Sequence, residues 1–272
     1  MSGSLESALR GQRAAGGKAL VPYVTGGLGE WELTVEAIAD AGADAIEVGI
    51  PFSDPVMDGP VIQEASQRAR DAGATPSSIL AGLAAVDVPA PMAVMTYYNI
   101  VHHFGLGRFA AELVVAGIDG AILPDLPLDE AGPWLAAADE AGVESVLLAA
   151  PTSSDDRLAA ICERSRGFVY GVGLLGVTGE RAALATTAKQ VAARLKATTD
   201  RPALIGVGVS TPEQAVQACE VADGVVVGSA IVRRIVEGAE PAEIAGLVGE
   251  FRAALDARWP RNAGAEGPVP EG

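Results

Sequence analysis

Short apolar segments alternate with helical patterns along most of this chain, and this alternation leaves few folds open to it. Most of the apolar segments are continuously apolar, which is typical of parallel strands buried on both faces. Parallel strands joined by helices require right-handed crossovers. Eight such segments predict a closed, single-domain α/β barrel of the (β/α)8 type: Ala19 to Val24, Ala45 to Gly49, Met92 to Thr96, Gly120 to Leu123, Ser145 to Ala149, Phe168 to Val172, Ala203 to Val207 and Gly224 to Val227.

An open, doubly wound dinucleotide-binding sheet is the main alternative fold. It would carry a G-x-G-x-x-G turn after its first strand, and Thr25-Gly26-Gly27-Leu28-Gly29 matches that pattern poorly. The expected barrel has more helices than the eight that a (β/α)8 barrel requires. Helical patterns are expected at Glu30 to Ala41, Ile62 to Ala72, Pro76 to Ala84, Leu106 to Ala116, Asp129 to Ala141, Ser154 to Arg164, Thr187 to Thr198, Thr211 to Glu220, Ala230 to Glu237 and Pro241 to Arg258.

Two connections are longer than a barrel requires. They run from Ile50 to Pro91, after the second strand, and from Gly173 to Thr186, after the sixth. Long loops at the carboxyl ends of barrel strands are where chemistry is usually built. We expect one barrel domain over residues 1–259 and a disordered tail, rich in Gly and Pro, over residues 260–272.

The charge and cysteine content exclude several classes of function. With 35 Asp and Glu against 19 Lys and Arg, the formal net charge is −16, and no basic run exceeds two residues. Nucleic acids and anionic membranes are bound by clustered basic residues, so neither is an expected partner. Cys162 and Cys219 are expected to be reduced and packed, and His102 and His103 offer no metal-ligand spacing, so no metal is expected. Without a signal peptide or a long apolar stretch, the protein is expected in the cytoplasm.

The segment from Glu47 to Pro60 is the most informative for chemistry. Glu47 lies near the carboxyl end of an apolar strand, where a carboxylate is expected only if it points into a functional mouth. Desolvation there raises the pKa of a carboxyl group, which suits a group that both donates and accepts a proton near neutral pH. Asp54 and Asp58 follow on a loop punctuated by proline. For Asp54, a structural role as the cap of a turn is as good an explanation as a role in the site.

Together with other short motifs in a fixed order, this segment resembles the tryptophan synthase alpha subunit family over about Leu5 to Arg258. That family cleaves indole-3-glycerol phosphate to indole and glyceraldehyde 3-phosphate. The motifs are Pro22-Tyr-Val-Thr-Gly-Gly, Glu47 to Pro60 with Val61-Ile62-Gln63, Met95-Thr-Tyr-Tyr-Asn99, Leu123-Pro-Asp-Leu-Pro127, Gly176-Val-Thr-Gly179, Gly206-Val-Gly-Val-Ser210 and Gly228-Ser-Ala-Ile-Val232.

The resemblance implies a site with an acid–base pair, an indole side and a phosphate side. Glu47 matches the catalytic glutamate and Asp58 the catalytic aspartate. The other implied residues are Tyr23, Ile62, Met95 and Tyr170 around the indole ring, Thr178 and Gly179 in a lid, and Gly179, Gly208, Gly228 and Ser229 at the phosphate. Because the chain is acidic, the phosphate is expected to be held locally by backbone N–H groups and a helix N-terminus. Asp125, in the loop after the fourth strand, fits either a structural role or a polar role in the active site, and the structural role is preferred.

The resemblance also implies a partner and leaves alternatives open. No cofactor is expected in this chain; pyridoxal phosphate would belong to a beta subunit in an alpha2beta2 heterotetramer. The sequence departs from the family at Gly173 and Leu174 in the lid, and at Ile100 and His102-His103 in the region that meets the beta subunit. The alternatives are a stand-alone indole-3-glycerol phosphate lyase, a catalytically silent regulatory barrel, and a phosphate-binding barrel isomerase.

Overall fold

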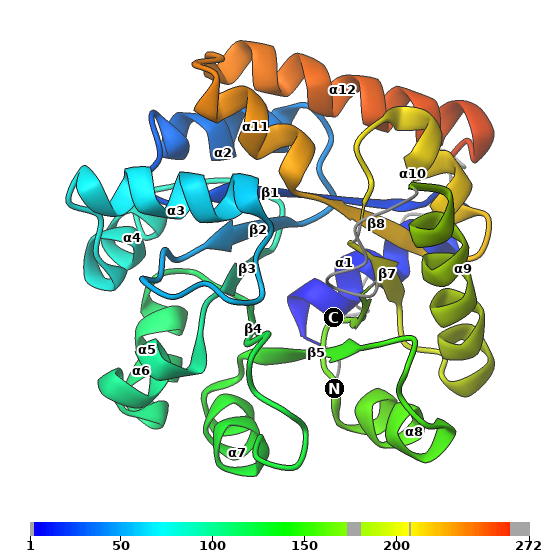
Figure 1. Cartoon of the computed structure of the whole chain (residues 1–272), viewed down its shortest axis with the longest axis horizontal. Coiled ribbons are helices and arrows are strands. Elements are labelled where there is room, and N and C mark those ends of the chain that lie inside the picture. Colours follow the sequence, from blue (N-terminus) through cyan, green and yellow to red (C-terminus); the bar gives the residue numbers. More distant parts are fainter. Residues whose placement is uncertain (1–2, 173–180, 207, 262–272) are drawn as a thin grey trace, which may run out of the picture.

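Eight parallel strands close into a barrel in the order of the chain, with β8 paired to β1 (Figure 1). The structure, a computed structural model, describes residues 3–172, 181–206 and 208–261. The strands are β1 (Ala19–Thr25), β2 (Ile46–Gly49), β3 (Met92–Met95), β4 (Gly120–Ile122), β5 (Glu144–Ala149), β6 (Val169–Gly171), β7 (Ala203–Ile205) and β8 (Gly224–Val227). The predicted (β/α)8 barrel is confirmed, and each expected strand is present with its ends shifted by two residues at most.

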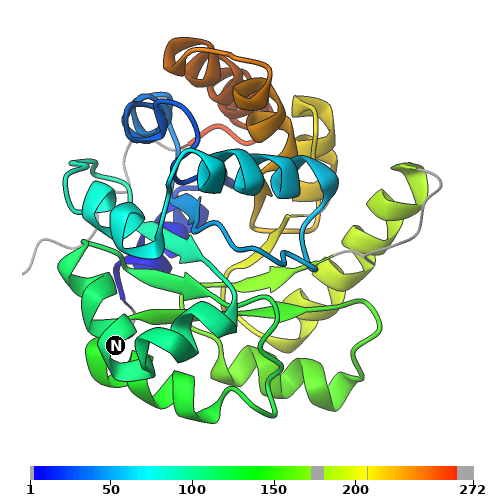
Figure 2. The same cartoon turned by 60° about the vertical axis from the view of Figure 1, so that its left-hand side comes forward.

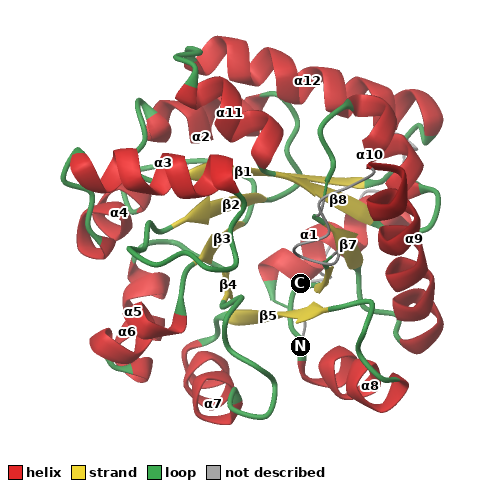
Figure 3. Ribbon diagram, viewed as in Figure 1, coloured by secondary structure: helices red, strands yellow, loops and turns green. Residues whose placement is uncertain are grey.

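Helices surround the strands on the outside of the barrel (Figure 3). They are α1 (Ser4–Ala14), α2 (Trp31–Asp40), α3 (Pro60–Asp71), α4 (Pro76–Leu83), α5 (Tyr98–Phe104), α6 (Leu106–Val115), α7 (Gly132–Ala141), α8 (Asp155–Arg164), α9 (Arg181–Thr198), α10 (Pro212–Cys219), α11 (Ser229–Val236) and α12 (Pro241–Arg258). The sequence patterns did not predict α1 or α5, and α9 begins earlier than expected. The last helix, α12, packs against α2 and α10 and so completes the ring beside the first strands (Figure 2).

The apolar strand residues divide into an outer and an inner layer. Outward-facing side chains such as Val24 and Val48 pack against the helices, with Phe251 of α12 in the same cluster. Inward-facing side chains such as Ile122 and Val226 fill the barrel itself. Because both faces are covered, the strands read as continuously apolar in the sequence, and the pattern alone does not reveal which residues face inward.

The amino-terminal helix α1 closes the bottom of the barrel and lies behind its centre in Figure 1. Leu5 and Leu9 of this helix are fully buried within the inner cluster. At the start of β5, the Glu144 carboxylate accepts the backbone N–H groups of Leu5 at 2.8 Å and of Glu6 at 3.1 Å. This carboxylate satisfies N–H groups that the first turn of a helix leaves unpaired. The mouth at the carboxyl ends of the strands is therefore the end at which a ligand can enter.

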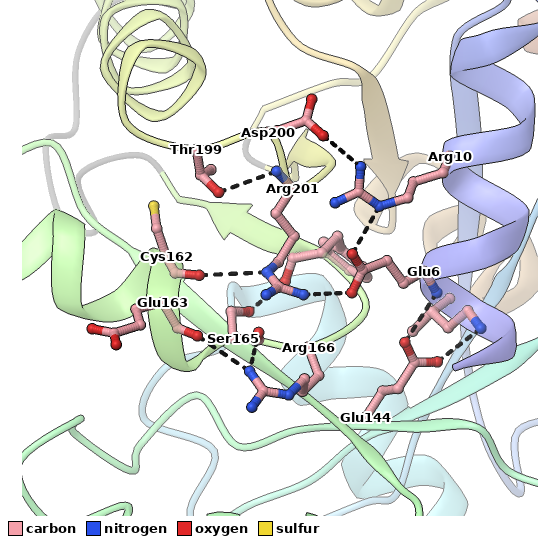
Figure 4. A network of polar contacts seen from close by, with 12 residues as sticks. Glu6, Arg10, Glu144, Cys162, Glu163, Ser165, Arg166, Thr199, Asp200 and Arg201 are labelled. Carbon is pink, nitrogen blue, oxygen red and sulfur yellow. Dashed lines mark hydrogen bonds and ion pairs between the residues drawn. The ribbon is translucent and has the colours of Figure 1, made fainter. Parts of the chain in front are cut away.

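A network of ion pairs fastens α1 to the segment before β7 (Figure 4). Glu6, which is buried, pairs with Arg10 at 2.8 Å and also with Arg201. Arg10 in turn reaches Asp200 at 2.7 Å. Removing one partner of a buried pair leaves an uncompensated charge, so these contacts fix the position of the helix.

Candidate active site

A cavity of about 260 Å³ opens at the carboxyl ends of the barrel strands. Its lining includes every site residue expected from the sequence except the two in the lid, Thr178 and Gly179, which lie outside the described residues. The lining residues are Tyr23, Glu47, Met57, Asp58, Gly59, Ile62, Met95, Ile122, Pro124, Leu148, Tyr170, Val172, Gly206, Gly208, Val226, Gly228 and Ser229. The barrel thus brings together residues from seven of its strands and from the loops and helices that follow them.

The carboxyl group of Glu47 is almost completely buried from solvent. It lies on β2, in register with Tyr23 on β1 and Ala93 on β3, and is 1% exposed. Its Oε2 atom has no hydrogen-bond partner within the described part of the chain. Burial, reinforced by the nearby negative charge of Asp58, raises the pKa of Glu47 to about 8. Near neutral pH, Glu47 is therefore a neutral acid.

Asp58 lies in a more polar setting in the loop that precedes α3. Its backbone N–H donates to the Pro55 carbonyl at 3.0 Å, which forms a tight turn just ahead of Pro60, the first residue of the helix. Burial raises the pKa of Asp58 to about 6, while a hydrogen bond from the Tyr97 hydroxyl opposes the rise. Near neutral pH, Asp58 is ionised. One cavity therefore contains a carboxyl group that can donate a proton and a second one that supplies a negative charge.

Tyr23 on β1 and Tyr170 on β6 occupy matching positions on strands that β7 and β8 separate. Tyr23 pairs with Glu47, two residues before Gly49, and Tyr170 pairs with Leu204, two residues before Gly206. A Cβ atom at Gly49 would lie 1.9 Å from the Tyr23 hydroxyl oxygen, and one at Gly206 would lie 2.1 Å from that of Tyr170. Each glycine therefore makes room for a ring that crosses the neighbouring strand.

Burial raises the pKa of both tyrosine hydroxyls, and the carboxyl groups of Glu47 and Asp58 act in the same direction. Both tyrosines are therefore neutral over the whole range in which the carboxyl groups titrate. They contribute flat apolar surface with a polar end, which suits a bicyclic aromatic ligand.

The other end of the cavity is built from backbone. Gly228 is the N-cap of α11, and Ser229 is the first residue of that helix. Gly208, with φ of +74°, turns the chain after β7 in a left-handed conformation that favours glycine. All three line the cavity. The free N–H groups and the dipole at a helix N-terminus form a ready site for an anion such as phosphate.

The comparison with known proteins identifies the family. The family model described as tryptophan synthase alpha chain matches residues 9–252. The tryptophan synthase alpha chain of Thermobifida fusca (strain YX) is 43% identical over 252 residues, which cover 90% of this chain and 93% of that protein. The alpha chain of Streptomyces coelicolor is 42% identical over 268 residues, covering 94% and 97%. This chain belongs to the tryptophan synthase alpha chain family.

Solved structures agree with this placement. The structure of Mycobacterium tuberculosis tryptophan synthase has a TM-score of 0.85 and 39% identity, with 94% of this chain and 99% of that chain covered. Tryptophan synthase subunit alpha from Legionella pneumophila str. Paris has a TM-score of 0.85 and 32% identity, covering 94% and 100%. As a tryptophan synthase alpha chain, the protein is an indole-3-glycerol phosphate lyase, a carbon–carbon lyase of tryptophan biosynthesis.

Several apolar residues of this alpha chain cavity were not predicted from the sequence. Ile122, Leu148 and Val226 line it from β4, β5 and β8, beside the expected Ile62 and Met95. These three residues lie inside continuous apolar runs, where the sequence does not show which side chain faces the barrel interior. The register of the strands supplies that information.

No catalytic role is expected for Asp125, the two histidines or the two cysteines, and all of them lie outside the cavity. The Asp125 carboxylate accepts the backbone N–H of Tyr98 at 2.9 Å, at the start of α5, which is a structural contact of the expected kind. His102 and His103 are exposed on α5. Cys162 and Cys219 are buried free thiols.

Among the described residues, no cluster of three His, Cys, Asp or Glu side chains could hold a metal ion, and no helix is long and apolar enough to cross a membrane.

Proposed function

We propose that Glu47 and Asp58 perform the cleavage of indole-3-glycerol phosphate in this cavity. In the first step, the neutral Glu47 carboxyl group delivers its proton to C3 of the indole ring. The ring becomes positively charged, and the ionised Asp58 carboxylate accepts the N1–H hydrogen bond and stabilises that charge. The observation that carries the proposal is that one cavity holds both carboxyl groups in different surroundings: Glu47 is buried with an unpartnered Oε2, whereas Asp58 accepts a hydrogen bond from Tyr97. Burial therefore raises the pKa of Glu47 further than that of Asp58.

In the second step, Glu47 gains a new proton, from the substrate. Its carboxylate takes the proton of the side-chain hydroxyl on the carbon attached to C3. The bond between that carbon and C3 then breaks, and its electron pair restores the aromatic ring. Indole and glyceraldehyde 3-phosphate are released, and Glu47 is again protonated. One group therefore serves as both acid and base, as general acid–base catalysis allows when its pKa lies near the working pH.

The remaining lining residues are proposed to position the substrate. Tyr23, Ile62, Met95 and Tyr170 would enclose the indole ring, and Gly208, Gly228 and Ser229 would bind the phosphate through backbone N–H groups. From the family resemblance, Thr178 and Gly179 would close over the substrate as a lid, with Gly179 also contacting the phosphate. A closing lid excludes water and completes the site.

The pH dependence of kcat/KM for indole release is expected to be bell-shaped. Activity falls below about pH 6 as Asp58 becomes protonated, and it falls above about pH 8 as Glu47 loses the proton that it must deliver. In Asp58→Asn, the residual activity should lose the acid limb. The alkaline limb should move to lower pH, because the charge of Asp58 helps to raise the pKa of Glu47. A flat profile between about pH 5 and 9 would contradict the assignment.

We further propose that the chain works in the cytoplasm with a tryptophan synthase beta subunit, as an alpha2beta2 heterotetramer. Pyridoxal phosphate would be bound by the beta subunit, with no cofactor in this chain. Support comes from the family and from the solved relative from Mycobacterium tuberculosis, which is a tryptophan synthase. The test is indole release from indole-3-glycerol phosphate by the purified chain, with and without its cognate beta subunit. A large activation is expected; high unaided activity that the beta subunit leaves unchanged would indicate a stand-alone lyase.

A further inference from the structure

The Tyr97 hydroxyl joins two neighbouring positions of the loop that carries Asp58. It accepts the backbone N–H of Met57 at 2.9 Å and donates to Asp58 Oδ2 at 3.1 Å. Since Asp58 lies at the cavity and Tyr97 follows β3, this side chain connects the loops after two adjacent strands. Tyr97 does not line the cavity, so any influence on the reaction passes through Asp58.

The Tyr97 ring is held firmly in place. Only 3% of its surface is exposed, and it stacks on Phe52 with ring centroids 5.0 Å apart and an interplanar angle of 24°. Phe52 stands near the beginning of the loop and Asp58 near its end. The backbone at the next residue is tied by the hydrogen bond from Tyr98 N–H to Asp125. Tyr97 therefore contacts both ends of the loop from Phe52 to Asp58, and its own backbone is held in place by the neighbouring hydrogen bond.

We propose that Tyr97 is a positioning residue that orients the Asp58 carboxylate toward the cavity and favours its ionised form. The inference rests on the proposed role of Asp58. In the described residues, Tyr97 is the side chain that donates a hydrogen bond to this carboxylate. A hydrogen bond to an ionised carboxylate is stronger than one to a neutral group, so the donor lowers the pKa of its acceptor.

The other titratable groups that act on Asp58 cannot take over this role. Glu47 on β2 is neutral near neutral pH, and it adds repulsion when it ionises. The negative charge of Asp58 helps to raise the pKa of Tyr23 on β1 and of Tyr170 on β6, so both hydroxyls stay neutral, and neither donates a hydrogen bond to the carboxylate in the described structure. Burial raises the pKa of Tyr97 well above that of Asp58, so the hydroxyl keeps its proton throughout the titration of the carboxyl group.

The test compares the pH profiles of kcat and kcat/KM in Tyr97→Phe and wild type. The substitution keeps the ring and its stacking on Phe52 but removes the donor. The acid limb is expected to move up by about one pH unit, and kcat near neutral pH to fall by about tenfold, because the ionised carboxylate loses its hydrogen-bond donor. KM should change by less than about threefold, since the charge that Asp58 stabilises develops in the transition state.

Tyr98→Phe is the matched control. It removes the hydroxyl of the adjacent tyrosine, whose ring lies against His102 instead of Phe52, and it should leave the profile unchanged. A wild-type acid limb in Tyr97→Phe, or a loss of activity that is uniform across pH, would overturn the inference.

Should Tyr97→Phe fail to fold, 3-fluorotyrosine at position 97 replaces it. Its more acidic hydroxyl is a stronger donor and should move the acid limb downward; an unmoved limb overturns the inference.

Asp58→Asn separates this inference from the proposed function. If Asp58→Asn retains wild-type turnover, the proposed role of Asp58 fails, and the inference about Tyr97 fails with it. If Asp58→Asn is inactive while Tyr97→Phe behaves as wild type, only the inference fails. Loss of activity in Asp58→Asn together with a shifted acid limb in Tyr97→Phe supports both.

Discussion

Glu47→Gln is expected to reduce the rate of indole release from indole-3-glycerol phosphate by at least about 10³-fold while substrate still binds. A single general acid–base transfer typically contributes on the order of 10² to 10⁴ in rate, and Glu47 is assigned both transfers. Glutamine keeps the size of the side chain but can neither deliver nor accept the proton. The measurement is kcat for indole release, alongside the affinity for a non-cleavable indole-3-alkyl phosphate.

Glu144→Gln is the control for Glu47→Gln. Glu144 is also a buried glutamate on a barrel strand, but its carboxylate lies at the bottom of the barrel and accepts backbone N–H groups of α1. Its substitution should lower stability and leave kcat within about twofold, because it is remote from the cavity. Turnover of Glu47→Gln within about tenfold of wild type would rule out the assigned role of Glu47.

Gly228→Asp is expected to weaken binding of both the substrate and inorganic phosphate by about a hundredfold or more. The new carboxylate would stand at the N-terminus of α11, where the phosphate is proposed to bind. Two like charges about 4 Å apart repel by about 4 kcal/mol at an effective dielectric constant of about 20. The dissociation constants of phosphate and of the non-cleavable indole-3-alkyl phosphate are the quantities to measure.

Gly228→Ala separates the charge from the added volume. A Cβ atom at this position would approach Tyr23 Cβ at 3.6 Å, an ordinary contact, and the backbone of Gly228, with φ of −107°, is open to other residues. Phosphate affinity in Gly228→Ala should therefore stay within a few-fold of wild type. Unchanged phosphate affinity in Gly228→Asp would show that the anion binds elsewhere.

The barrel could be predicted from the sequence because its strands are buried on both faces. Continuous apolar runs such as Gly224 to Val227 mark such strands clearly, and the helical patterns between them fix the parallel topology. The place of Glu47 in the cavity was predictable for a related reason, whereas the role proposed for Asp58 was implied by the family resemblance. A carboxyl group such as Glu47 inside an apolar strand is costly unless it has a function, and that cost is visible in the sequence.

The parts that could not be predicted depend on contacts between distant segments. In α1, Leu5 and Leu9 are the buried apolar residues, and their role in closing the barrel depends on its diameter and on Glu144, far along the chain. The short helix α5 is fixed at its start by Asp125 from the loop after β4. Likewise, the pairing of Tyr97 with Asp58 joins residues 39 positions apart, and neither residue alone signals it.

In the proposed mechanism, Glu47 is a protonated acid and Asp58 is ionised near neutral pH. Difference infrared spectroscopy of wild type minus Glu47→Gln measures this directly, since a protonated carboxyl group and a carboxylate absorb at separate frequencies. We expect a protonated carboxyl band near neutral pH that disappears as the pH rises through about 8. A difference spectrum that contains only a carboxylate band from about pH 5 upward would contradict the account, because Glu47 would then have no proton to deliver to the indole ring.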